Sequence, residues 1–163
     1  MFHTGSGKQI GFAGIPDTIL AYYNRHKDLT NIKIIIGTDS QNFSDTKMVS
    51  VICVIAAGRG GIFFYNISRI DRIVDVRRKL HIETNASLEL ASGLVEIFEG
   101  NEKYHAMYLD CPISIHVDAG NSPHGKTREL IPELVRWIRA SGYEAETKPL
   151  SFVASCVADK ISK

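Results

Sequence analysis

Three apolar segments rich in β-branched residues follow one another at 32–38, 48–57 and 62–67. The connection between the first two is short and polar, and the connection between the last two is a short glycine-rich turn at 58–61. Parallel strands need a crossover of about a dozen or more residues, whereas antiparallel strands can be joined by a tight turn. The three segments are therefore predicted to pair as antiparallel strands.

Downstream of these segments, the chain alternates helical and strand patterns. Apolar residues recur at three- and four-residue steps over 76–97, which predicts a long helix that ends near Gly100. Either Asp71 or Asp75 is expected to cap it. Further strands are predicted at 113–117 and 143–147, and further helices at 130–140 and 151–162. Strands joined through helices pair in parallel, so this half is expected to extend the sheet in that way.

This order of elements predicts an α/β fold. Its core is a mixed sheet of about five strands, three antiparallel and the rest helix-connected, with helices on both faces. Upstream, 16–27 is predicted to form a short helix with Pro16 in its first turn, and the glycine-rich segment 1–14 is predicted to be irregular. A length of 163 residues predicts one domain over 1–163 with a sizeable core.

The composition excludes several classes of protein. With 44% hydrophobic and 23% charged residues, the composition is that of a folded rather than a disordered protein. The net charge of +1 is too small to attract polyanions to the whole surface, so any nucleic-acid binding must use local basic patches. No apolar run approaches about 18 residues, and no signal-peptide pattern opens the chain. The three cysteines are too widely spaced for a zinc site. A cytoplasmic protein with reduced thiols is expected.

Two aspartates follow predicted strands directly. Asp39 ends the first strand and Asp118 ends the strand at 113–117. Loops beyond strand ends are where open α/β sheets bind ligands, so both residues are candidate ligands. Ser40 and Gln41, next to Asp39, are candidates to orient substrate or water. The alternative for either aspartate is that it opens a turn or caps an element.

Glu83 occupies an unusual position for a carboxylate. It lies three residues after Leu80 and seven before Leu90, and therefore on the apolar stripe of its own helix. A carboxylate that faces the sheet must be paired, hydrogen-bonded or bound to metal, because burying it alone is costly. A buried salt bridge is the alternative. Glu89 is the competing candidate, but its helical neighbours are polar or small, so it is predicted to face solvent.

Asp159 repeats this argument in the last predicted helix, where it follows Phe152 and Cys156 along one side. The alternative is a helix-end aspartate beside Lys160 and Lys163. Together, Asp39, Glu83, Asp118 and Asp159 would repel one another without a counter-ion, and oxygen ligands suit Mg²⁺ or Mn²⁺. A pair of such ions can bind the attacking and leaving oxygens of a phosphoryl displacement, one activating water and the other stabilising the departing oxygen.

Five short motifs accompany these carboxylates: GTDSQ at 37–41, IE at 82–83 with SLELA at 87–91, HVD at 116–118, KP at 148–149 and ADK at 158–160. With these motifs the chain resembles the YkuK family, a predicted group of ribonuclease H-like proteins, over nearly its whole length beyond about residue 14. The resemblance implies a ribonuclease H-like fold. It also implies an acidic site of Asp39, Glu83, Asp118 and Asp159 that holds two Mg²⁺ or Mn²⁺ ions and hydrolyses phosphodiesters.

Other polar residues near the motifs have more than one interpretation. His124 is a candidate for proton transfer or product release, or a plain loop residue. His116 is either a partner of the acidic site or a satisfied histidine on the sheet face. Lys148 is a candidate for contact with a phosphate. A basic stretch is either a phosphate contact or a solvated face, and it comprises Arg69, Arg72, Arg77, Arg78 and Lys79.

The functional prediction is a metal-dependent nuclease that acts on nucleic acid, with RNA, DNA and hybrid substrates all open. Two alternatives remain. One is a nucleic-acid-binding or scaffold protein of the same fold without turnover, and the other is a phosphohydrolase acting on small phosphate esters. Fold alone does not decide among them.

Overall fold

The computed structural model describes residues 1–28, 31–119, 127–148 and 150–151. Its strands are β1 (Phe2–Thr4), β2 (Gln9–Ile10), β3 (Ile32–Asn42), β4 (Thr46–Ala56), β5 (Gly61–Ile70), β6 (Ile113–Val117) and β7 (Glu144–Thr147). Its α-helices are α1 (Ile15–His26), α2 (Val76–Glu99), α3 (His105–Asp110) and α4 (Ile131–Ala140), and two 3₁₀ turns cover Phe12–Gly14 and Glu102–Tyr104.

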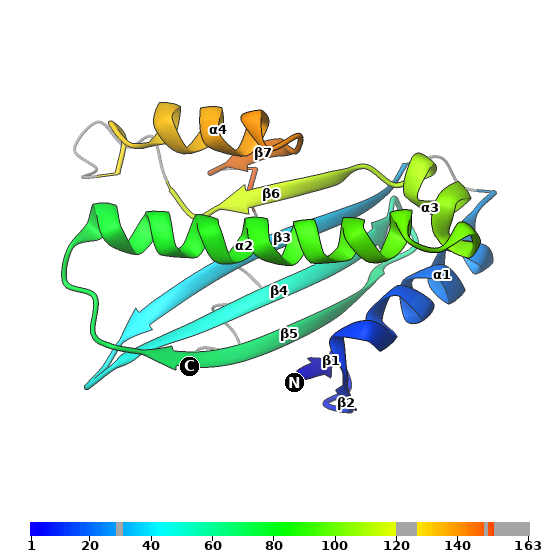
Figure 1. Ribbon diagram of the computed structural model, residues 1–163, viewed down its shortest axis with the longest axis horizontal. Helices are drawn as coiled ribbons and strands as arrows, with labels where there is room; N and C mark the ends of the chain where they lie inside the picture. Colours follow the sequence, from blue (N-terminus) through cyan, green and yellow to red (C-terminus); the bar gives the residue numbers. More distant parts are fainter. Residues whose placement is uncertain (29–30, 120–126, 149, 152–163) are drawn as a thin grey trace.

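The described strands form one mixed sheet in the order β2-β1-β5-β4-β3-β6-β7 (Figure 1). The β3–β4 and β4–β5 pairs are antiparallel, and the β3–β6 and β6–β7 pairs are parallel. Both pairings agree with the predictions from connection length. The α/β fold with a mixed sheet is thereby confirmed, although the sheet has seven strands rather than about five.

The prediction that 1–14 is irregular is wrong. β1 and β2 pair as a small antiparallel hairpin, and β1 also pairs with β5 through His3 and Tyr65. Phe2 is buried in the main core, which anchors the hairpin to the edge of the sheet. Gly7 adopts a φ of 84° in the turn, a conformation that glycine takes without strain. The strands are too short to produce a periodic pattern in the sequence.

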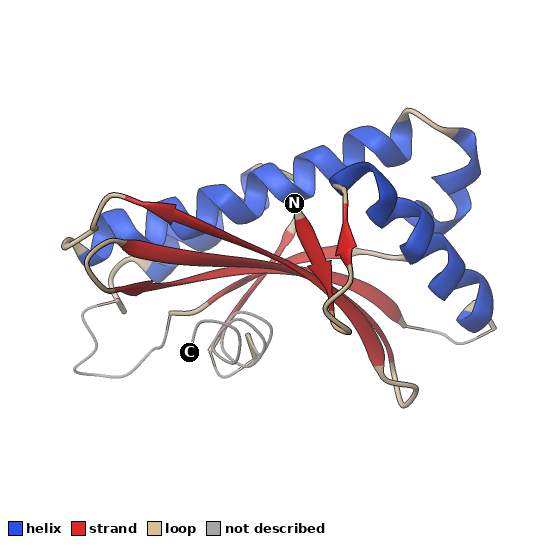
Figure 2. Cartoon of the chain, turned by 90° about the horizontal axis from the view of Figure 1, so that it is seen from below, coloured by secondary structure: helices blue, strands red, loops and turns tan. Residues whose placement is uncertain are grey.

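All four described α-helices lie on one face of the sheet (Figure 2). The helix predicted at 151–162 falls almost entirely outside the described residues. α2 begins after Asp75, whose side chain accepts a hydrogen bond from the backbone N–H of Arg78 at 2.7 Å, so Asp75 rather than Asp71 is the cap. α3 has six residues and was not predicted. None of the described helices has the length and apolarity that a membrane crossing requires.

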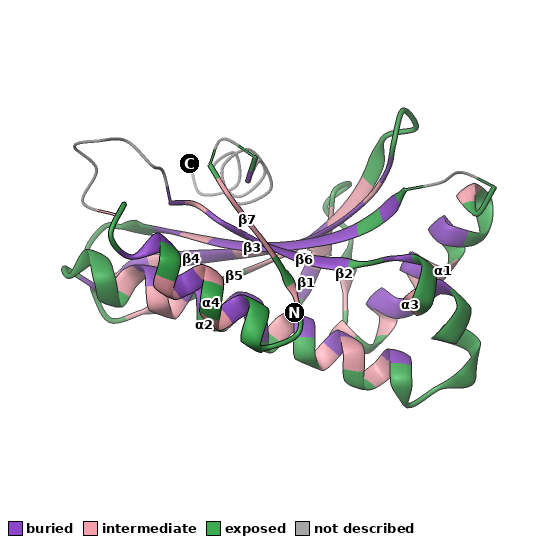
Figure 3. Cartoon of the chain, turned by 90° about the horizontal axis from the view of Figure 1, so that it is seen from above, coloured by how far each residue is buried: buried purple, intermediate pink, exposed green. Residues whose placement is uncertain are grey.

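The main core lies between the helices and the sheet, where β3 and α2 present their buried faces to one another (Figure 3). Strand alternation directs Ile34 and Ile36 into this core, while Ile35 joins a smaller apolar cluster with β4 residues on the other face. On α2, Leu94 and Phe98 are fully buried. The same alternation and helical spacing position the polar residues that follow along β3 and α2.

Replacing Phe98 by alanine is expected to lower the free energy of unfolding by about 3–5 kcal/mol, because it leaves a cavity in a packed core. Phe98 is fully buried, and its ring lies 5.8 Å from that of Tyr104 and 5.7 Å from that of Tyr108. Urea denaturation measures the loss. Phe43→Ala, at a position 49% exposed, is the control and should cost little. Similar losses in both variants would contradict this account of the core.

Candidate metal and active site

Asp39 lies within β3 rather than at its end. The strand continues to Asn42, because Gln41 and Asn42 still pair with Lys47 and Thr46 of β4. Alternation along the strand turns Ser40 toward α2 and Asp39 toward the opposite face of the sheet. Asp39 is partly buried. The prediction that Asp39 ends the first strand is therefore wrong by three residues. The prediction that Asp39 belongs to this strand is correct.

Asp118 follows β6 directly, as predicted, and lies level with Asp39. The parallel pairing of β3 with β6 runs as far as Gly37 and His116, and each aspartate lies two residues beyond this pair. β7 places a cation beside them: the Lys148 Nζ atom lies 2.6 Å from the Asp118 Oδ1 atom. Neighbouring strands of the sheet therefore bring two carboxylates and one ammonium group to the same end.

Glu83 faces the sheet from α2, as its place on the apolar stripe predicted, and is only 5% exposed. The Ser40 hydroxyl donates a 2.6 Å hydrogen bond to the Glu83 Oε1 atom, and Lys79, one turn earlier, lies 3.8 Å from the same atom. Burial raises the pKa of Glu83 to about 7, and the negative charges of Asp39 and Asp118 add to this, while Ser40 and Lys79 oppose it. The charges of Asp39 and Asp118 therefore both reach Glu83 electrostatically.

A row of hydrogen-bonded hydroxyl groups, here called the polar seam, lies next to Glu83 where α2 crosses the sheet and comprises Thr38, Ser50 and Ser87. Ser87 donates to the Thr38 hydroxyl at 2.9 Å, and Thr38 donates to Ser50 at 3.0 Å. A small cleft beside the seam is lined by Thr38, Glu83, Thr84, Ser87, His116, Val117 and Asp118. The Thr84 hydroxyl in this cleft is buried and has no hydrogen-bond partner in the described part of the chain.

By its chemistry alone, the donor set is of the kind that hard divalent cations take, because Asp39, Glu83 and Asp118 offer only oxygen ligands. Burial is the largest cause that raises the pKa of Glu83. Within the described ranges, no group of three His, Cys, Asp or Glu side chains adopts an arrangement that could hold a metal ion. Lys148 and Lys79 lie against two of the three carboxylates. Asp159, the fourth predicted ligand, lies outside the described residues.

His116 is buried in β6, and burial lowers its pKa to about 4, with Lys33 contributing. The imidazole is therefore neutral at physiological pH and adds no positive charge to the cleft that it lines. His124, the other histidine considered for this site, falls outside the described residues.

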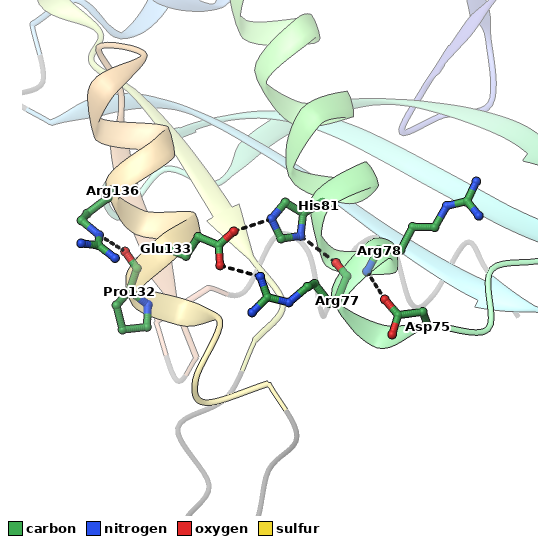
Figure 4. Close-up of polar contacts among 7 residues, drawn as sticks. All are labelled: Asp75, Arg77, Arg78, His81, Pro132, Glu133 and Arg136. Carbon is green, nitrogen blue, oxygen red and sulfur yellow. Dashed lines mark hydrogen bonds and ion pairs between the residues drawn. The ribbon is translucent and has the colours of Figure 1, made fainter.

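Part of the basic stretch has a structural role that the sequence did not indicate. Arg77 and His81 of α2 both bind Glu133 of α4, at 2.9 Å and 2.8 Å, and the other ring nitrogen of His81 lies 2.8 Å from the Arg77 carbonyl oxygen (Figure 4). Arg69 forms an ion pair with Asp45 at 2.7 Å. Arg77 therefore links α2 to α4, and Arg69 links β5 to the turn between β3 and β4. No periodic signal could have paired α2 with α4 in advance.

The sequence gives no signal for the pairing of Ser40 with Glu83, because the two residues are 43 positions apart and lie on different elements. The Lys79–Glu83 contact did have a signal in the sequence, because residues four apart on a helix are neighbours.

Comparison with known proteins agrees with this architecture. The family model described as "Ribonuclease H-like" matches residues 15–163. A protein of Bacillus subtilis (strain 168), described as "Uncharacterized protein YkuK", is 28% identical over 170 residues, a match that covers all of this chain and 97% of the relative. No solved structure gives a significant match. With a mixed sheet of the expected order and a family match over nearly the whole chain, this protein belongs to the ribonuclease H-like family.

Proposed function

We propose that the chain is a metal-dependent nuclease that hydrolyses phosphodiester bonds in nucleic acid. The observation that carries the proposal is the environment of Glu83. Burial raises the pKa of this carboxylate, and the negative charges of Asp39 and Asp118 raise it further. A buried carboxylate that lies near two others is suited to bind positive charge. Membership of the ribonuclease H-like family supports a nuclease-type activity.

In this proposal Asp39, Glu83, Asp118 and Asp159 hold two Mg²⁺ or Mn²⁺ ions. When bound, these ions supply activation of water and stabilisation of the charge on the departing oxygen. The protein positions the ligands: Ser40 fixes the Glu83 carboxylate from β3, and the seam of Thr38 and Ser87 holds α2 against the sheet. Because these contacts come from regular elements, the ligand positions are defined before substrate binds.

One observation favours a second candidate, a nucleic-acid-binding protein without turnover. The Lys148–Asp118 ion pair and the Lys79–Glu83 contact place lysines where a cation is required. If these contacts are permanent, the acidic cluster is structural and the protein binds its partner without cutting it.

A titration and a cleavage screen distinguish the candidates. Mn²⁺ binding is measured by titration calorimetry, and labelled RNA, DNA and hybrid strands are then incubated with the protein and Mn²⁺ or Mg²⁺, with a chromogenic phosphate ester in parallel. We expect ion binding together with cleavage of at least one polymer, which also identifies the substrate. Binding of polymers without cleavage would favour the second candidate. Turnover of the ester alone would indicate a small-molecule phosphohydrolase. Absence of ion binding would overturn the metal site.

A further inference from the structure

Lys148 is held beside the acidic site by the sheet itself. The parallel pairing of β6 with β7 ends with Val117 opposite Thr147, so Asp118 and Lys148 are the next residues in register. The backbone N–H of Lys148 donates to the Ala119 carbonyl oxygen at 3.2 Å, which continues the ladder past the end of both strands. The position of this lysine is therefore a consequence of strand register and not of a chance contact between surface side chains.

The ammonium group is bound to an oxygen of Asp118 that the proposed metal site would use. Its Nζ atom is 2.6 Å from Asp118 Oδ1, and this oxygen is shielded from solvent. A Mg²⁺ ion bound to the same oxygen would lie about 2.0–2.1 Å from it. A carboxylate offers several lone pairs, so an ion and the ammonium group would compete for Asp118 rather than strictly exclude one another. Like-charge repulsion between them favours departure of the lysine head group when an ion binds.

Lys148 is the more exposed of the two lysines at the site. Its side chain is 48% exposed, whereas Lys79, the other lysine of the site, is 29% exposed and lies 3.8 Å from Glu83. Lysine carries a compact point charge on a flexible four-carbon stem, so the head group can swing several ångströms without moving the backbone. An ammonium released next to a metal-binding carboxylate lies where a substrate phosphate would approach, and lysine is a common phosphate ligand.

We propose that Lys148 is a displaceable counter-ion of the active site. It pairs with Asp118 while no divalent ion is bound, and when an ion takes its place it binds a phosphate of the nucleic-acid strand. This inference rests on the proposed nuclease function and adds to it a residue that couples ion binding to substrate binding.

The test compares Lys148→Gln with Lys103→Gln, a closely matched control. Lys103 is 47% exposed and lies 2.7 Å from Asp17 on α1, away from the site. Mn²⁺ titration of Lys148→Gln should give a dissociation constant about 3- to 10-fold lower than that of the native protein, because the competing charge is gone. The KM for the cleaved polymer should rise about tenfold, and Lys148→Arg should restore it in part. Lys103→Gln should match the native protein in both measurements.

The outcomes separate this inference from the proposed function. If the native protein binds Mn²⁺ and Asp118→Asn abolishes binding, but Lys148→Gln binds Mn²⁺ no more tightly, the counter-ion role is overturned and the proposed function stands. Tighter Mn²⁺ binding with an unchanged KM would overturn the phosphate contact alone. If the native protein binds no Mn²⁺, or if Asp118→Asn binds it equally well, both the proposed function and this inference are overturned.

Discussion

Replacing Asp118 by asparagine is expected to lower the rate of phosphodiester cleavage by about 10³-fold or more. Asparagine keeps the shape of the side chain but removes the negative charge that would hold a divalent ion. Loss of an ion that stabilises transition-state charge costs several kcal/mol of activation free energy, and each 1.4 kcal/mol is about a tenfold change in rate. Single-turnover cleavage of the substrate identified in the screen measures the effect.

The fold should survive this substitution, because Asp118 lies after β6 and contributes no apolar surface to the core. Its pair with Lys148 is partly exposed, and such pairs contribute about 1 kcal/mol or less. Asp28→Asn, an exposed position after the end of α1, is the control and should cleave at the native rate. A folded Asp118→Asn protein that cleaves normally would exclude Asp118 from the site.

Replacing Glu83 by glutamine is expected to abolish cleavage and, without divalent ions, to stabilise the fold in a pH-dependent way. Burial raises the pKa of Glu83 from its ordinary value of 4.5 to about 7. Below pH 4.5 the carboxyl group is neutral in both the folded and the unfolded chain, so its ionisation does not change the free energy of unfolding. As the pH rises toward 7 the unfolded chain ionises first, and the folded state loses stability. Above pH 7 the loss is complete, at about 1–3 kcal/mol.

Glutamine does not titrate, so the variant should escape this loss. Its free energy of unfolding in urea with a chelator should exceed that of the native protein by about 1–3 kcal/mol at pH 8, and by about 1 kcal/mol or less at pH 5. The glutamine carbonyl oxygen can still accept the hydrogen bond from Ser40. Glu89→Gln, on the exposed side of the same helix, is the control and should show no such pH dependence. Equal stability of Glu83→Gln and the native protein at pH 8 would show that Glu83 is already compensated.

These two expectations are linked by one physical point. A buried carboxylate whose ionised form destabilises the fold is seldom retained for structural reasons, because a neutral side chain of the same shape is more stable. We therefore expect the charge of Glu83 to serve the proposed metal site.

The sequence by itself determined most of the longer elements, and for α2 it also determined which face is buried. The strict alternation at 113–117 produced the bounds of β6, and the helical period predicted α2 and the burial of Glu83 on it. These features depend on residues a few positions apart, and backbone geometry is the same wherever the element lies in the fold. The order of strands and helices was enough for the mixed sheet, since short connections permit few topologies. That Asp39, Glu83, Asp118 and Asp159 together hold metal stays a prediction.

Only the tertiary structure decided which side chains meet. The hydrogen bond from Ser40 to Glu83 joins residues 43 positions apart, and the ion pair between Lys148 and Asp118 depends on the register of β6 with β7. The hairpin of β1 and β2 likewise exists because β5 offers it an edge and the core accepts Phe2. No periodicity within a segment encodes such contacts, because they are set by strand register and helix packing, to which every element of the fold contributes.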